Sequence, residues 1–213
     1  MKEFSLQGDT TLIRSQATFD LIEVLAPYVT FEFVPPHTQL FFSVDGINMC
    51  YLLRSGLMKV CRNADGFVIS SLATPNIMGI TNRVPHNSGL FIETLSDAEI
   101  AILTTDRAHE IIAQNNAWEL LVGHITTITT NLFKKNVIMT APTSYDILKF
   151  QLMSLMNEPV DIRETLSAAK YILERTRLSR STVMKMLSQL KVGGYIEMEE
   201  GMLKAVHRLP EKY

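Results

Sequence analysis

The hydrophobic pattern of the chain changes about halfway along, and this change limits the folds that the sequence allows. Over residues 29–103, short apolar runs alternate with turn-forming pairs such as Asp65-Gly66. Strand-length runs at this spacing are typical of a compact all-β roll or barrel. From Thr105 onward, and also over residues 11–28, apolar residues recur at helical spacing instead. We therefore expect an α+β fold in which an N-terminal β-roll is followed by helices.

Charge is divided unevenly along the chain, although the formal net charge is only −2. Residues 1–141 carry 9 Lys/Arg and 13 Asp/Glu, whereas residues 142–213 carry 11 and 9. The window 163–191 is sharper still, with 7 basic residues against 2 acidic ones. A basic segment at one end of an acidic body suits an anionic polymer as partner, although a solvated surface would give the same counts.

The clearest domain boundary is Ala141-Pro142-Thr143, because the residue before a proline is pushed out of the α region. It divides the chain into a sensor-like domain over residues 1–115, a long helix over 116–141 and a third domain over 142–213. Apolar residues along the long helix follow a heptad pattern. The pattern fits a coiled-coil dimer contact, which we favour, or packing of the helix on its own β-roll. The predicted dimer seam consists of Trp118, Leu121, Ile125, Ile128, Leu132 and Met139.

The segment from Ser167 to His207 carries the functional prediction. A helix to about Arg175 is followed by a tight turn, and Ser179 is placed to cap a second helix by accepting a hydrogen bond from a first-turn amide. The second helix has four apolar residues on one predicted buried side: Val183, Met186, Leu187 and Leu190. Gly193-Gly194 ends this helix, and two short strands then form a hairpin. This order is typical of a winged helix-turn-helix that binds DNA.

The other side of the second helix is polar and basic, as a helix in the major groove requires. Arg180 can donate two hydrogen bonds to one guanine, and the short side chains of Ser181 and Thr182 allow close approach to the bases. Cations on neighbouring elements can contact phosphates. The predicted DNA-binding residues are Lys170, Arg175, Arg177, Ser179, Arg180, Ser181, Thr182, Lys185, Gln189 and Lys204. The alternative is a generic three-helix packing element whose basic side chains are only solvated.

Several of these motifs together resemble the CRP/FNR regulator family along nearly the whole chain. They are Leu53-Arg54-Ser55-Gly56, Gly66, Gly79, the long helix, and the run from Leu178 to Val183. The runs 175–181, 191–198 and 208–213 look closer still to an enterobacterial branch, the IprA (YaiV) type inhibitors of hydrogen peroxide resistance. The resemblance implies a cyclic-nucleotide-binding-like β-roll, a dimerisation helix and a C-terminal winged helix-turn-helix. It also implies a homodimeric transcription regulator that binds double-stranded DNA, contacts RNA polymerase and acts in the oxidative-stress response.

The sequence departs from the family where cyclic-nucleotide-binding members hold their ligand. Those members use a Gly-Glu pair for the ribose and a later Arg-Ser/Thr-Ala for the phosphate. Here Ile80 follows Gly79, and the later triplet reads Asn87-Ser88-Gly89. Burying a cyclic phosphate without a cation is costly, so we predict no dependence on a cyclic nucleotide. The degenerate pocket consists of Gly79, Ile80, Arg83, Asn87, Ser88 and Gly89. In the helix before the recognition helix, Tyr171 stands where many members place a glutamate that helps to read bases.

We predict no cofactor and no metal site. Cys50 and Cys61 are too few for a four-thiolate cluster and lie in apolar runs, where burial makes a thiol inert. Lone histidines such as His109 and His124 leave haem ligation open, although a lone histidine is more often structural. The sequence offers no nucleophile–base pair and no phosphate-binding loop, so we do not expect an enzyme.

Neither a signal peptide nor an apolar run of membrane-spanning length is found, and we expect a cytoplasmic protein. The alternative function is a small-molecule-binding β-roll whose C-terminal domain mediates protein contacts. A β-roll interior that is filled with apolar side chains would argue against this alternative.

Overall fold

The computed structural model describes residues 15–72, 74–81, 89–139 and 143–210, without the side chains of residues 135, 137–139 and 161. The chain divides into two compact units. We call Ile13–Thr129 the roll unit and Thr130–Tyr213 the winged-helix unit. The predicted boundary at Ala141-Pro142 lies outside the described residues.

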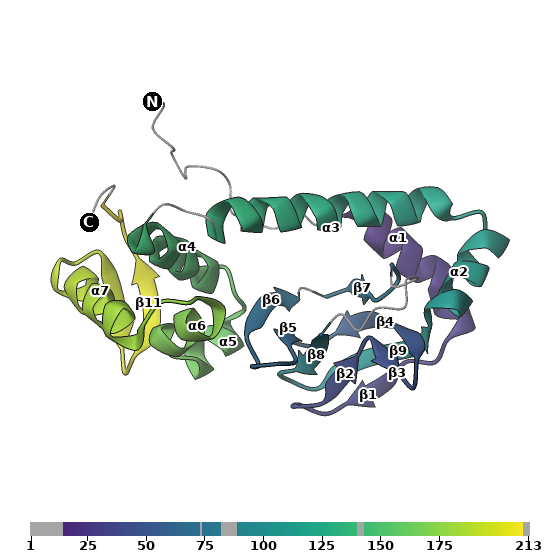
Figure 1. Cartoon of the computed structure of the whole chain (residues 1–213), viewed down its shortest axis with the longest axis horizontal. Coiled ribbons are helices and arrows are strands. Elements are labelled where there is room, and N and C mark those ends of the chain that lie inside the picture. Colours follow the sequence, from purple (N-terminus) through teal and green to yellow (C-terminus); the bar gives the residue numbers. More distant parts are fainter. Residues whose placement is uncertain (1–14, 73, 82–88, 140–142, 211–213) are drawn as a thin grey trace. The chain divides into compact units, whose positions relative to one another are not determined.

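The roll unit contains two antiparallel sheets (Figure 1). One has the strand order β1-β9-β4-β3, with β7 also paired to β4, and the other has the order β2-β8-β5-β6. The strands are β1 (Glu32–Val34), β2 (Gln39–Phe41), β3 (Ser43–Val44), β4 (Ile47–Ser55), β5 (Met58–Arg62), β6 (Val68–Leu72), β7 (Asn76–Met78), β8 (Leu90–Thr94) and β9 (Ala98–Thr104). Asp65-Gly66 lies in the turn between β5 and β6, which confirms the predicted hairpin.

Strand β4 shows how the roll unit is packed, because successive side chains of a strand point to opposite faces. Tyr51 and Leu53 lie in a core cluster with residues of β2, β5, β8 and β9. Cys50 and Leu52 lie in a second cluster with residues of the helices α1 (Gln16–Leu25), α2 (Thr105–Gln114) and α3 (Trp118–Met139). The β4 strand is therefore buried on both faces, one inside the roll and one beneath helices.

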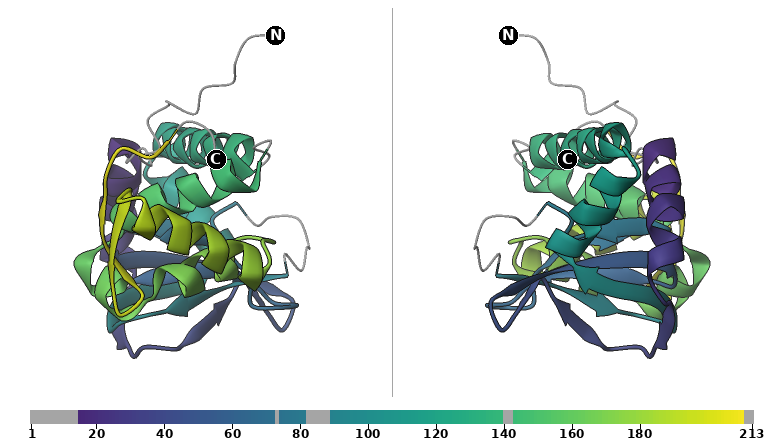
Figure 2. Two further views of the ribbon diagram at one scale, coloured as in Figure 1. Left: turned by 90° about the vertical axis from the view of Figure 1, so that its left-hand side faces the viewer. Right: turned by 90° about the vertical axis from the view of Figure 1, so that its right-hand side faces the viewer.

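The winged-helix unit has a core of its own. Its elements beyond α3 are α4 (Ser144–Met156), α5 (Val160–Thr165), α6 (Ala168–Arg175), α7 (Arg180–Val192), β10 (Ile196–Glu199) and β11 (Met202–Val206). Figures 1 and 2 show these helices gathered around the β10–β11 hairpin. Leu148 and Leu152 of α4 pack with Ile172 of α6 and with the apolar side of α7. Among the helices described, none combines the length and the apolar character needed to cross a membrane.

Candidate nucleic-acid interface

Helix α7 begins as the sequence predicts. The Ser179 hydroxyl accepts a hydrogen bond from the backbone N–H of Thr182 at 3.1 Å, which confirms the predicted cap. The same oxygen lies 2.9 Å from Ser181 Oγ and 2.8 Å from Thr182 Oγ1. Three hydroxyl groups are therefore held together at the N-terminus of the helix, where the helix dipole favours negative charge.

The two sides of α7 differ as expected. The predicted apolar residues are all buried: Val183, Met186, Leu187 and Leu190. Four of the predicted base-reading residues are exposed: Arg180, Ser181, Lys185 and Gln189. Thr182 is half-buried beside the cap. Burial of one side in the core thus fixes which side chains the helix presents to a partner.

A glycine in the left-handed region ends α7. Gly194 has a φ of 72°, which an L side chain adopts only with strain. Its N–H donates to the carbonyl of Lys191 at 3.1 Å, and the next N–H, of Tyr195, donates to Leu190 at 2.9 Å. This pair of bonds is a Schellman cap. It turns the chain directly into the β10–β11 hairpin, which forms the wing.

The wing carries its cation beside a carboxylate. The Lys204 ammonium lies 3.8 Å from the Glu199 carboxylate across the hairpin, and His207 Nε2 lies 2.8 Å from Glu197 Oε1. All four side chains are exposed. A phosphate at Lys204 would therefore compete with Glu199, and the wing supplies less positive potential than its lysine alone suggests.

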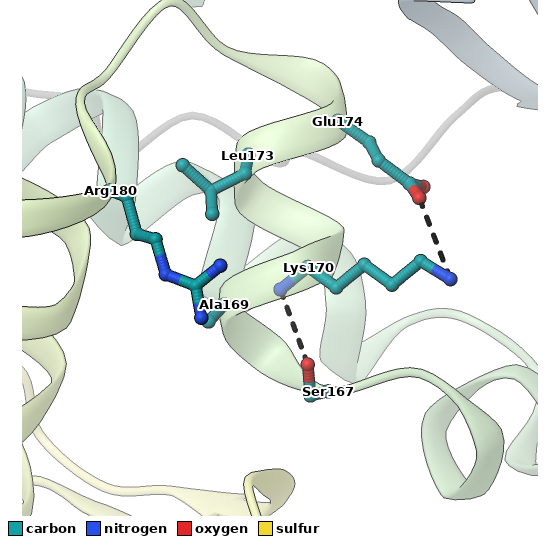
Figure 3. Close-up of a pocket in the computed structure, with 6 residues that line it drawn as sticks. All are labelled: Ser167, Ala169, Lys170, Leu173, Glu174 and Arg180. Carbon is teal, nitrogen blue, oxygen red and sulfur yellow. Dashed lines mark hydrogen bonds and ion pairs between the residues drawn. The ribbon is translucent and has the colours of Figure 1, made fainter.

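Lys170 and Arg180, two of the predicted DNA-binding cations, line one cavity of about 350 Å³ beside α6 and the start of α7. Its lining residues are Ser167, Ala169, Lys170, Leu173, Glu174 and Arg180. Figure 3 shows Arg180 extending from α7 into this region, while Lys170 reaches along α6 toward Glu174, 3.9 Å away. The Ser167 hydroxyl caps α6 by accepting from the Lys170 N–H at 3.3 Å. Sequence reasoning missed Leu173 and Glu174, because only the packing of the two helices brings them beside Arg180.

Arg175 departs from the prediction. Only 8% of its surface is exposed, its guanidinium lies 3.7 Å above the Tyr171 ring, and Nη1 donates to the Tyr171 carbonyl at 3.3 Å. The prediction that Arg175 contacts a phosphate is therefore wrong, because its guanidinium stacks on the Tyr171 ring and donates to the backbone at the end of α6. Tyr171 is itself only 2% exposed and donates its hydroxyl to Glu158 at 2.8 Å. It is a core residue, so it does not occupy a base-reading position.

Arg177 lies in the turn between α6 and α7 and is exposed, as is Lys170. Both side chains keep the accessibility that a phosphate contact requires. Of the four cations predicted outside α7, the structure therefore leaves three accessible and buries one.

The predicted dimer seam on α3 is exposed at four positions, and Leu121 is the exception. Leu121 is 6% exposed and packs in the core of the roll unit, so its assignment to the seam is wrong. The exposed members are Trp118, Ile125, Ile128 and Leu132. Val122 and Phe133 are also exposed and extend the apolar surface that the sequence pattern outlined. The side chain of Met139 lies outside the described residues.

The described part of the degenerate pocket is occupied by core packing. Ile80 is 1% exposed and joins the cluster beneath the helices, and its carbonyl lies 2.7 Å from His109 Nε2. Gly79 has a φ of 84°, and a Cβ there would clash with the Met49 carbonyl oxygen. Gly89 has a φ of 60° and open space around it. Arg83, Asn87 and Ser88 lie outside the described residues.

Apolar side chains form a buried cluster inside the roll. The buried members of this cluster are Leu40, Phe42, Tyr51, Leu53, Met58, Ile92, Ala98 and Ile100.

Both cysteines are buried, and neither forms a disulfide. Burial raises the pKa of the Cys50 thiol to about 12, so it stays protonated and unreactive at neutral pH. Cys61 lies in a different cluster, with Val68 and Phe91. His124 is fully buried, its Nδ1 lies 2.8 Å from Thr18 Oγ1, and burial lowers its pKa. Over the ranges that the structure covers, no three His, Cys, Asp or Glu side chains gather as metal ligands do.

Comparisons with known proteins find relatives of the C-terminal unit and of the whole chain. Residues 144–211 match the family model for winged helix-turn-helix DNA binding. The inhibitor of hydrogen peroxide resistance of Escherichia coli K12 is 29% identical over 178 residues, 82% of this chain and 85% of that protein.

Solved structures of regulators share the fold. The c-di-GMP-responsive global regulator CLP of Xanthomonas campestris superposes with a TM-score of 0.69 at 16% identity, over 90% of this chain and 100% of that one. A transcriptional regulator of the CRP/FNR family from Eubacterium rectale superposes with a TM-score of 0.59 at 15% identity, over 88% and 89%. With its β-roll and its long helix, this chain shares the fold of these regulators, and residues 144–211 form a winged helix-turn-helix DNA-binding domain.

Proposed function

We propose that the chain is a homodimeric, sequence-specific regulator that needs no cyclic nucleotide and serves the oxidative-stress response. The observation that carries this proposal is the division of α7 into a buried apolar side and an exposed side with Arg180, Ser181, Lys185 and Gln189. A recognition helix needs this division, because one side must be fixed to the protein while the other meets base edges.

The residues proposed to read bases lie on the exposed side of α7. Arg180 is the strongest candidate, since its guanidinium can donate to O6 and N7 of one guanine. Lys185 lies beyond it on the exposed side, and the cap hydroxyls of Ser179 and Ser181 can donate to a phosphate or a base. Lys170, Arg177 and Lys204 are proposed to contact phosphates.

The exposed apolar residues of α3 support the homodimer. Leu132 is 61% exposed and Phe133 is 65% exposed, on a helix of 22 residues. Exposed large apolar side chains in a row mark a protein contact more often than a solvated surface. A second copy of the same helix offers a matching surface. A dimer carries two α7 helices, as an operator with two half-sites requires.

Independence from cyclic nucleotides is supported by Ile80 and by the apolar cluster inside the roll. Where nucleotide-binding members of the family place a glutamate, Ile80 is buried in a cluster of apolar side chains. Apolar side chains form a buried cluster inside the roll as well. A cyclic nucleotide would have to displace core side chains and would find no carboxylate at this position.

The link to oxidative stress rests on the relative's name, inhibitor of hydrogen peroxide resistance, and on 29% identity over most of both chains. The buried thiols argue that such a role is exerted through the genes that the protein controls. A thiol with its pKa raised to about 12 is a poor target for peroxide.

The test is a fluorescence-anisotropy titration of the full-length chain with a duplex that it selects from a random-sequence pool. Affinity should fall steeply as salt rises, because each phosphate contact releases counterions. Arg180→Ala should weaken binding to the selected duplex by about tenfold or more and binding to an unrelated duplex far less. Arg107→Ala is the matched control, since Arg107 is an exposed arginine of the roll unit, and it should bind as the unsubstituted chain does.

If the chain selects no common sequence, or if Arg180→Ala binds the selected duplex as tightly as before, the base-reading role of α7 is wrong. Sedimentation analysis tests the dimer in the same samples. Leu132→Glu should yield monomers, whereas Gln114→Glu, on an exposed polar position of α2, should not.

A further inference from the structure

Met184 is a large apolar side chain on the exposed side of α7. It is 48% exposed, whereas the neighbouring Val183 and Met186 are buried. Val192, the other exposed apolar residue of this helix, is its last residue. An isolated apolar residue on a protein surface is ordinary, so the position of Met184 decides whether it matters.

That position is the centre of the surface proposed to face DNA. Residues three and four apart are neighbours on a helix surface. The neighbours of Met184 are therefore Arg180 and Ser181 on the preceding turn and Ser188 on the following turn, and all three are exposed. Ser181 is held toward the cap, with its hydroxyl 2.9 Å from Ser179 Oγ. Both serines are short, so the Met184 side chain reaches beyond them from the helix surface.

The chemistry of the major groove limits what such a side chain can recognise. Base edges there carry hydrogen-bond donors and acceptors and a single apolar group, the C5 methyl of thymine. A thioether chain is flexible and polarisable and adapts to a small apolar partner. A cytosine or guanine edge would instead leave its polar groups facing a side chain that cannot satisfy them.

We propose that Met184 determines specificity by contacting a thymine methyl group next to the base that Arg180 reads. The inference rests on the proposed function, since it requires α7 to lie in the major groove. It adds a preference for thymine that hydrogen-bonding residues alone would not create.

The experiment replaces one thymine at a time by deoxyuridine in a duplex that the full-length chain selects from a random pool. Deoxyuridine keeps base pairing and removes only the methyl group. Affinity should fall about fourfold at one thymine per half-site, the factor that corresponds to burying one methyl group. Met184→Gln should lose this sensitivity, whereas Met184→Leu should keep it. Methionine, leucine and glutamine have similar helix propensities, so all three chains should fold.

Met153→Gln is the matched control, because Met153 is an exposed methionine (39%) on α4 of the same unit. It should show the unsubstituted pattern of deoxyuridine effects. The inference is overturned if no deoxyuridine weakens binding, or if Met184→Gln keeps the same sensitive position. Failure of the proposed function looks different, because then no common sequence is selected and Arg180→Ala has no effect.

Discussion

The residues predicted to matter for function are exposed in one unit of this chain and buried in the other. In the winged-helix unit, a buried apolar stripe holds α7 so that Arg180, Ser181 and Lys185 remain accessible. In the roll unit, Ile80, which the resemblance aligns with a ligand-binding glutamate, is 1% exposed in the core. The same kind of packing therefore leaves one side of α7 accessible in one unit and buries residue 80 in the other.

Ile80→Glu is the strongest test of this difference between the two units. A carboxylate at this position would be buried among apolar side chains without a partner, so the free energy of unfolding should fall by about 3–5 kcal/mol. Urea denaturation measures the change. Ile80→Val keeps an apolar side chain of similar shape and should cost about 1 kcal/mol. A stable Ile80→Glu protein that gains affinity for a cyclic nucleotide would show that residue 80 faces a ligand pocket.

In the winged-helix unit, two arginine variants distinguish a residue that stabilises the fold from one that contacts DNA. Arg175→Ala removes the stacking on Tyr171 and the hydrogen bond to its carbonyl, so the free energy of unfolding should fall by about 2 kcal/mol. Arg177→Ala changes an exposed side chain and should leave stability within about 0.5 kcal/mol. Its DNA affinity should fall similarly for every sequence, and the salt dependence should decrease by about one counterion.

Thermal unfolding measures the stability of both arginine variants, and anisotropy titrations measure their DNA affinity. If Arg175→Ala is as stable as the unsubstituted chain but binds DNA poorly, the buried arginine serves recognition after all.

The winged-helix unit could largely be predicted from the sequence, because the features that define its elements are local. The cap at Ser179, the apolar stripe of α7 and the glycine that ends it act within one or two helical turns, so the sequence alone indicates them. The hairpin turn at Asp65-Gly66 is local in the same sense. Predictions of this kind were confirmed because no distant residue has to take part.

The errors concern residues whose environment is set by distant parts of the chain. Periodicity places Leu121 on the apolar side of α3, but only the packing of α1 and α2 decides that it faces the core. A basic segment indicates that Arg175 can face DNA, but only the ring of Tyr171 shows that its charge is turned inward. Charge and spacing predict a surface, whereas tertiary contacts decide which of its members reach solvent.

The smallest expected effect concerns the pH dependence of stability in the two units. His124 of the roll unit is fully buried, and burial lowers its pKa, so the folded protein resists protonation there. The unfolded chain takes up this proton near the ordinary histidine pKa, about 6.5. The contribution of neutral His124 is therefore complete above that pH and is lost as the pH falls below it. Urea denaturation from pH 7.5 to 5 should show this loss, limited by one proton to about 1.4 kcal/mol per pH unit.

His124→Asn should flatten that part of the pH profile, while His207→Asn, in the exposed wing, should leave it unchanged. The carboxylates are the same in all three proteins, so the difference between profiles isolates the imidazole. His124 Nδ1 lies 2.8 Å from Thr18 Oγ1. Burial away from water opposes a charged ring and outweighs the opposite effect of the Ile77 backbone, which is the physical reason for the expected slope. Equal slopes in all three proteins would mean that the folded roll unit accepts the proton at His124. The contrast between a closed roll unit and an accessible side of α7 would then have no support at His124.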